Sequence, residues 1–184
     1  VIGNMPAWNF PVDLSVGPLV EMLAAGNRVI IKPSEQTPAV GQLLAEMLGD
    51  TFAREQVSVV NGGLDLARNF STLKWDHLLY TGNTAVGKEV MRNAAQNLVP
   101  VTLELGGRNP TVFTEEAVTR DNVRIMLGSK LTKNGQLCIA VNHVLVPETA
   151  RDKFIGLVRE VIEAAVGDYT TSPHVGCAVI NARQ

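Results

Sequence analysis

Cys138 is the residue with the greatest chemical potential in this chain. It follows Gly135-Gln136-Leu137, behind a predicted helix. A cysteine presented on such a turn can face a pocket, where its thiolate acts as a nucleophile. Most free cysteines are instead small buried apolar residues, and no paired base stands near Cys138 in the sequence. A nucleophilic role therefore depends on what the other segments supply.

Two more residues have types suited to acyl chemistry. Glu104 ends a predicted strand just before Gly106 and Gly107, and a glutamate there can act as a general base toward water. Asn9 follows the opening strand between Trp8 and Phe10, and its amide can donate to an oxyanion. Each also has an ordinary interpretation: a solvated strand-end glutamate, and an asparagine that completes a turn before a helix.

Two loops have the composition of a dinucleotide site. In Lys32-Pro-Ser-Glu35, the carboxylate can accept both hydroxyls of a ribose and the lysine can donate to the same sugar. In the segment from Gly82 to Gly87, glycine and the free N–H groups of a helix N-terminus favour a phosphate. The alternatives are a surface ion pair and a common strand-to-helix turn. The glycine spacing also differs from the usual Gly-x-Gly-x-x-Gly.

These loops connect strands and helices that alternate along the chain. Alternation predicts an α/β fold with a mostly parallel sheet covered on both faces, and ligands then bind at the carboxyl ends of the strands. Predicted strands cover residues 1–3, 27–33, 56–60, 77–80, 99–105, 111–113 and 143–146. Predicted helices begin near residue 14 and cover 37–49, 65–73, 84–97, 121–133 and 148–166, and 175–184 reads as the start of another.

Composition excludes several classes of protein. The 184 residues are 46% hydrophobic and 18% charged, with a net charge of −2, which is typical of a globular chain. No stripe of basic residues suggests binding to nucleic acid. No apolar run reaches the length of a membrane span. The two cysteines, Cys138 and Cys177, have no metal-ligand spacing, so no metal site or disulfide scaffold is expected, and a reducing cytoplasm is favoured.

Five short segments in order resemble the successive motifs of the NAD(P)-dependent aldehyde dehydrogenase superfamily. They are WNFP (8–11), KPSE (32–35), YTGNTAVG (80–87), LELGG (103–107) and GQLC (135–138). Residues 19–32 and 84–88 look most like the class-three and coniferyl aldehyde branch. The sequence departs from the family pattern in places. Arg108-Asn109 stands where Lys-Ser is usual, and Pro6-Ala7 precedes Trp8 where a proline is usual.

The resemblance implies a role for each of these residues. Cys138 would attack the aldehyde, the Asn9 amide and the Cys138 N–H would hold the oxyanion, hydride would pass to the nicotinamide, and Glu104 would activate water against the thioester. Lys32 and Glu35 would bind the adenosine ribose. The remaining cofactor contacts implied are Gly82, Asn83 and Gly87 at the pyrophosphate, Leu105 and Gly106 near the nicotinamide, and Trp8.

The same resemblance implies how the chain is organised. Residues 1–107 would be a Rossmann-like cofactor-binding domain lacking its N-terminal part, and 108–184 the first part of an α/β catalytic domain. Such an internal fragment is expected to be inactive alone, and either poorly soluble or partly molten. Glu35 should repel a 2′-phosphate, which favours NAD, with NADP as the alternative.

The resemblance also suggests partners and leaves other functions open. The substrate would be an aromatic or long aliphatic aldehyde, and the full protein a cytoplasmic homodimer or homotetramer. Two alternatives remain: a cysteine-dependent esterase or thioesterase without a redox step, and a non-catalytic relative.

Overall fold

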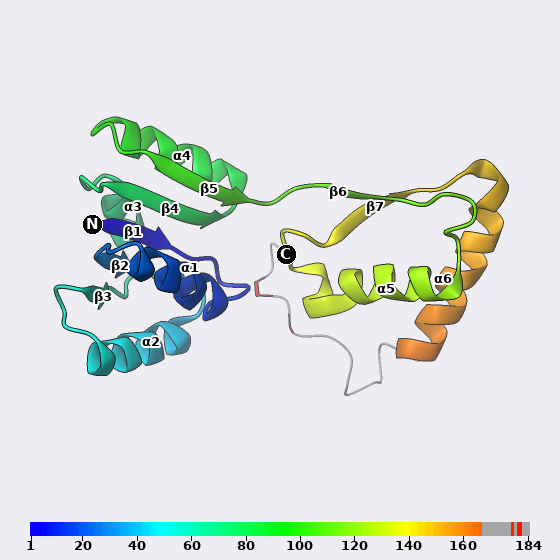
Figure 1. Cartoon of the computed structure of the whole chain (residues 1–184), viewed down its shortest axis with the longest axis horizontal. Coiled ribbons are helices and arrows are strands. Elements are labelled where there is room, and N and C mark those ends of the chain that lie inside the picture. Colours follow the sequence, from blue (N-terminus) through cyan, green and yellow to red (C-terminus); the bar gives the residue numbers. More distant parts are fainter. Residues whose placement is uncertain (167–177, 179, 182–184) are drawn as a thin grey trace. The chain divides into compact units, whose positions relative to one another are not determined.

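The computed structural model describes residues 1–166, 178, 180 and 181, and it divides into two compact units. The first unit is Val1–Gly106 and the second is Gly107–Gln184, whereas the sequence led us to expect a boundary after residue 107. Each unit has its own sheet and its own core, so each is described by itself (Figure 1).

The first unit is built on a five-stranded sheet in the order β3-β2-β1-β4-β5. All four strand pairings are parallel, which confirms the predicted α/β fold. The chain builds outward from β1 to β3 and then crosses back to β4, so its direction reverses between β1 and β4. Such a reversal is where ligands bind in open parallel sheets. The strands are Ile2–Met5 (β1), Val29–Ile31 (β2), Val57–Val59 (β3), His77–Gly82 (β4) and Val101–Leu105 (β5).

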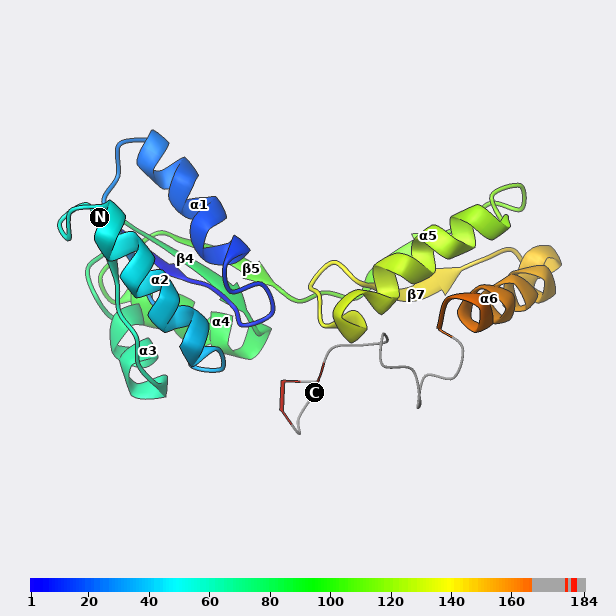
Figure 2. The same cartoon turned by 90° about the horizontal axis from the view of Figure 1, so that it is seen from below.

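Four helices cover the two faces of this sheet (Figure 2). Leu19 of α1 and Leu48 of α2 pack on one face against alternate residues of β2 and β3. Phe70 of α3 and Val90 of α4 belong to the core on the other face, with Leu78 of β4. The predicted helices are confirmed with shifted ends. They are Asp13–Ala24 (α1), Pro38–Thr51 (α2), Leu64–Ser71 (α3) and Thr84–Ala95 (α4).

Helix α1 is completed by a side chain from β1. Pro18 lies inside the helix and has no N–H, so the carbonyl of Leu14, four residues earlier, lacks its helical donor. The Nδ2 of Asn4 donates to that carbonyl at 3.2 Å, and Asn4 is fully buried. This contact ties the start of α1 to the central strand, on the two sides of the turn that carries Asn9.

The second unit pairs a two-stranded parallel sheet with two helices. The strands are Asn109–Val112 (β6) and Val141–Leu145 (β7), and the helices are Arg120–Leu131 (α5) and Arg151–Val166 (α6), joined by short 3-10 turns at Thr132–Gly135 and Glu148–Ala150. Phe113, Val123 and Val161 are among the residues of its core. No helix among the described residues is long and apolar enough to cross a lipid bilayer.

The prediction that helix 121–133 continues to Lys133 is wrong. The helix ends at Leu131, because Lys133 and Asn134 adopt left-handed backbone conformations with φ of 49° and 56°. The stretch before Cys138 is therefore a tight irregular turn rather than a helix end. Cys177 and most of the helix expected over 175–184 lie outside the described residues.

Candidate active site

The predicted site residues of the first unit follow the carboxyl ends of its strands. Asn9 comes after β1, Lys32 after β2 and Asn83 after β4. Glu104 is the next-to-last residue of β5. Because these strands are parallel, their carboxyl ends lie along one edge of the sheet.

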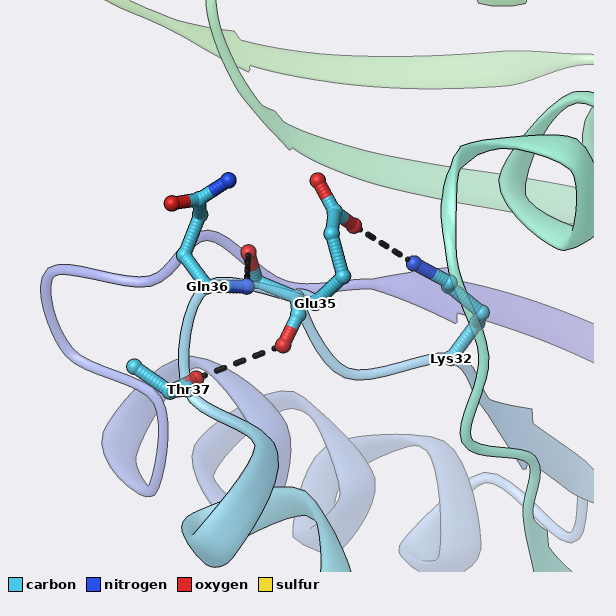
Figure 3. Close-up of polar contacts among 5 residues, drawn as sticks. Lys32, Glu35, Gln36 and Thr37 are labelled. Atoms are coloured by element: carbon cyan, nitrogen blue, oxygen red, sulfur yellow. Dashed lines mark hydrogen bonds and ion pairs between the residues drawn. The ribbon is translucent and has the colours of Figure 1, made fainter. Parts of the chain in front are cut away.

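Lys32 and Glu35 form an ion pair after β2 (Figure 3). The Lys32 Nζ lies 2.8 Å from Glu35 Oε2, and the two side chains point toward each other. Burial raises the pKa of Glu35, but the hydrogen bond and the charge of Lys32, with backbone and Gln36 hydrogen bonds, outweigh it. The pKa of Glu35 therefore lies below its usual value, and the carboxylate is held ionised.

The backbone around Glu35 is fixed by its neighbours. The Oγ of Ser34 accepts from the Gln36 N–H at 3.3 Å, and the Thr37 hydroxyl donates to the Ser34 carbonyl at 3.4 Å (Figure 3). Pro38 then opens α2 at its first position, where its missing N–H would have no helical partner in any case. The carboxylate is thus held by a turn that leads directly into a helix.

Two glycines flank the turn between β4 and α4: Gly82 ends β4, and Gly87 lies in the first turn of α4. A Cβ at Gly87 would lie 2.7 Å from Leu105 Cδ2, and one at Gly82 would collide with the Tyr80 hydroxyl. Asn83 caps α4, since its Oδ1 accepts from the Ala85 N–H at 2.7 Å.

Tyr80 lies beside both the glycine turn and the acidic group of the neighbouring loop. Its hydroxyl donates to the Asn83 carbonyl at 3.5 Å. Burial raises the pKa of Tyr80, and the negative charge of Glu35 raises it further, so the net shift is upward. The phenol is therefore neutral, and Glu35 lies close enough to affect it.

The remaining predicted residues of the first unit have different exposures. Glu104 is exposed on β5, where it stands opposite Thr81, and Leu105 stands opposite Gly82. Trp8 and Asn9 are partly buried in the turn before α1. Gly106 is exposed at the end of the unit.

Cys138 is an exposed free thiol in the second unit. Its carbonyl accepts a hydrogen bond from Asn109 Nδ2 at 2.7 Å, and the same nitrogen donates to the carbonyl of Ala140 at 3.0 Å. Sequence reasoning noted Asn109 only as a departure from the family pattern and missed this contact. The one signal that could have found it is Pro110, which removes a backbone donor next to Asn109.

The three residues predicted to do chemistry are divided between the units. Asn9 and Glu104 belong to the first unit, and Cys138 belongs to the second. No distance from the Cys138 sulfur to the Asn9 amide or the Glu104 carboxylate therefore follows from the described units. Within the first unit, Lys32 contacts Glu35, and the Leu105 side chain lies against Gly87.

Comparison with known proteins identifies the family. Residues 1–184 match the profile of the aldehyde dehydrogenase family over their whole length. The chain belongs to the aldehyde dehydrogenase family. This confirms the resemblance seen in the five motifs.

Two curated relatives agree with the expected branch. The chain is 45% identical to a probable coniferyl aldehyde dehydrogenase of Pseudomonas aeruginosa, over all of this chain and 38% of that protein. It is 36% identical to aldehyde dehydrogenase family 3 member A2 of Rattus norvegicus, over 96% of this chain and 37% of that protein. The chain thus spans less than two fifths of the length of these aldehyde dehydrogenases.

A solved structure extends the likeness to three dimensions. A Mycobacterium tuberculosis aldehyde dehydrogenase complexed with NAD+ is 33% identical and superposes with a TM-score of 0.79. The match covers 89% of this chain and 34% of that one.

Proposed function

We propose that this chain belongs to an enzyme that oxidises an aldehyde to a carboxylic acid with NAD(P), through a covalent intermediate on Cys138. The observation that carries the proposal is an exposed cysteine, on a turn held by Asn109, in a chain of the aldehyde dehydrogenase family. In this assignment the first unit binds the cofactor and the second carries the nucleophile.

The first unit has features that fit a dinucleotide. A Cβ at Gly82, the last residue of β4, would collide with the Tyr80 ring, and one at Gly87 of α4 would press on Leu105. The N-terminus of α4 between them offers N–H groups to a pyrophosphate beside Asn83. Glu35 is the more exposed member of its ion pair and would accept the ribose hydroxyls. Lys32 is buried, so we assign it the task of holding that carboxylate ionised and oriented. Trp8, Leu105 and Gly106 complete the proposed cofactor contacts.

The chemistry assigned to the chain uses three of its residues. The Cys138 thiolate adds to the aldehyde carbonyl to form a thiohemiacetal, whose oxyanion accepts hydrogen bonds from the Asn9 amide and the Cys138 N–H. A bound NAD would supply the hydride acceptor that conversion of the thiohemiacetal to a thioester requires. Glu104 then takes a proton from water, which attacks the thioester and releases the acid and the thiolate.

Matched cysteine variants test this assignment in the whole protein. Cys138→Ser should abolish aldehyde-dependent reduction of the nicotinamide, followed by absorbance, because the hydroxyl is a much weaker nucleophile at neutral pH. Cys177→Ser, at the second cysteine of the chain, serves as the control and should keep activity. Near-wild-type turnover by Cys138→Ser would refute the proposal. Ester cleavage without any cofactor-dependent reaction would favour the esterase or thioesterase alternative.

The proposal also covers the class of aldehyde, the cellular compartment and the oligomeric state. The relative named for coniferyl aldehyde supports an aromatic aldehyde, and a long aliphatic aldehyde is the second choice. A panel of both classes with NAD and NADP would rank them. Cysteine usage supports a cytoplasmic protein, and a homodimer or homotetramer is proposed on family grounds; light scattering of the whole protein would distinguish the two.

A further inference from the structure

The turn that carries Cys138 is constrained by unusual backbone on its N-terminal side. Lys133, Asn134 and Gly135 in succession have positive φ, at 49°, 56° and 74°. For a residue with a Cβ this conformation costs about 1–2 kcal/mol, so two such residues persist only where the surroundings fix them. The backbone that leads into the cysteine turn therefore has a defined left-handed conformation.

On the C-terminal side the turn is fixed by Asn109. Asn109 opens β6 opposite Val141, but the next residue, Pro110, pairs with His143, so the register shifts at this point. Proline also has no N–H to give to the ladder. Asn109 supplies donors from its side chain instead: Nδ2 lies 2.7 Å from the Cys138 carbonyl and 3.0 Å from the Ala140 carbonyl.

These contacts use the special chemistry of a primary amide. Its nitrogen carries two hydrogens, so one atom satisfies two carbonyls that lie two residues apart. An aspartate of the same shape offers two acceptors and would repel both carbonyls, a leucine offers nothing, and a serine offers a single hydrogen. Asparagine is the side chain of this size that can hold both ends of the turn.

We propose that Asn109 is the positioning residue for the nucleophile, an inference that rests on the proposed role of Cys138. By holding the Cys138 and Ala140 carbonyls, Asn109 sets the direction of two peptide planes, the one between Cys138 and Ile139 and the one between Ala140 and Val141. It thereby limits the directions in which the thiol and the Cys138 N–H can point. It touches neither substrate nor cofactor and acts through the backbone of Cys138.

Kinetics of the whole protein test this role. Asn109→Leu and Asn109→Asp, both close in shape to asparagine, should lower kcat about ten- to a hundredfold, because displacement of a reacting group by about an ångström has effects of this size. The dissociation constant for NAD should stay unchanged, since the proposed cofactor residues lie in the first unit. Asn109→Ser keeps one donor and should restore part of kcat.

A matched control separates this effect from the general loss of an amide. The Nδ2 of Asn122 donates to the Ala117 carbonyl at 2.9 Å in the same unit, away from the cysteine turn. Asn122→Asp should therefore keep the wild-type kcat. Leucine and aspartate variants at 109 with wild-type kcat would overturn the proposal, as would an equal loss in Asn122→Asp.

A second measurement keeps this test independent of the proposed function. Acylation of Cys138 by p-nitrophenyl acetate needs no cofactor, and peptide mass spectrometry can locate the acetyl group. Acylation should slow in the order wild type, Asn109→Ser, Asn109→Leu; equal rates would reject the role of Asn109. A wild-type protein that acylates but oxidises no aldehyde would refute only the dehydrogenase proposal. If the leucine and aspartate variants do not fold, the serine variant decides: an unchanged acylation rate would reject the proposal.

Discussion

Lys32 Nζ lies 2.8 Å from Glu35 Oε2, and the two side chains differ sharply in exposure, at 2% for the lysine and 30% for the glutamate. The ammonium is thus almost entirely removed from water and depends on one carboxylate. Removing that carboxylate would leave a desolvated charge without its partner, which is the costly way to break a buried pair.

The first prediction concerns stability and pH. Glu35→Gln should lower the free energy of unfolding by about 1–3 kcal/mol at pH 7, between the values for exposed and buried pairs. The pKa of Glu35 is lower in the folded state, so its stabilisation is complete above its unfolded pKa. It is lost as the pH falls through the folded pKa, which lies below the unfolded one. Urea unfolding at neutral and acidic pH should therefore show the two proteins converging in acid.

The control for this prediction is an exposed glutamate on the helix that follows. Glu46 of α2 accepts a hydrogen bond from Gln42 at 2.8 Å on the surface. Glu46→Gln should change the free energy of unfolding by only a few tenths of a kcal/mol. A gap between wild type and Glu35→Gln that persists unchanged into acid would show that ionisation of Glu35 is not its source.

The second prediction concerns the choice of cofactor and rests on the proposed function. A carboxylate at the ribose repels a 2′-phosphate, so Glu35→Gln should improve NADP binding relative to NAD by about ten- to a hundredfold. Titrating the whole protein with each nucleotide gives the ratio. Lys32→Met is the companion variant and should weaken both nucleotides, because it releases Glu35 from its fixed direction. An unchanged ratio in Glu35→Gln would remove this residue from the ribose site.

How far the sequence predicted this structure depends on the range of the contact involved. Elements set by local patterns were predicted well: β2, α2 and α4 fall at the predicted 27–33, 37–49 and 84–97, with their ends shifted by one or two residues. The pairing of Lys32 with Glu35 spans only three residues and was also foreseeable.

What the sequence did not predict are contacts in which a side chain replaces a distant backbone group. Asn4 bonds to Leu14, and Asn109 reaches 29 residues along the chain to Cys138. In each case a nearby proline lacks an N–H, and the asparagine side chain supplies a donor to a carbonyl. Which asparagine does so can be seen only when the tertiary arrangement is known. The helix predicted to reach Lys133 ends at Leu131 instead, because Lys133 and Asn134 leave the right-handed helical conformation.

The third prediction is a double-mutant cycle on such a contact. Asn4→Ala should cost about 1–3 kcal/mol, since it leaves the partly buried Leu14 carbonyl without a donor. In a Pro18→Ala background the new N–H at position 18 can take that carbonyl, so the cost should fall by about 1 kcal/mol. The loss of side-chain volume at Asn4 is common to both backgrounds and cancels in the cycle.

A second asparagine supplies the control for this cycle. Asn61 donates to the Gly41 carbonyl of α2 at 3.0 Å, in a helix without an internal proline. Asn61→Ala and Pro18→Ala should therefore have additive effects in urea unfolding. Additivity of Asn4→Ala with Pro18→Ala would mean that the missing proline N–H is not what Asn4 replaces.

The fourth prediction is a stabilising substitution after α4. Leu98 has φ of 55° and is 92% exposed, and it lies where the chain leaves the helix. The N–H groups of Val99 and Leu98 donate to the carbonyls of Ala94 and Ala95 at 3.1 Å each, a closure in which glycine is the usual residue.

Leu98→Gly should therefore raise the free energy of unfolding by about 1 kcal/mol, because it removes the Cβ strain of the left-handed conformation while giving up almost no buried surface. Leu98→Ala is the matched variant: it also shortens the exposed side chain but keeps the Cβ, so it should give no such gain. Urea unfolding of the two variants side by side makes the comparison. Equal stabilisation by alanine would mean that the gain comes from trimming an exposed apolar side chain, and that backbone strain at position 98 contributes nothing measurable.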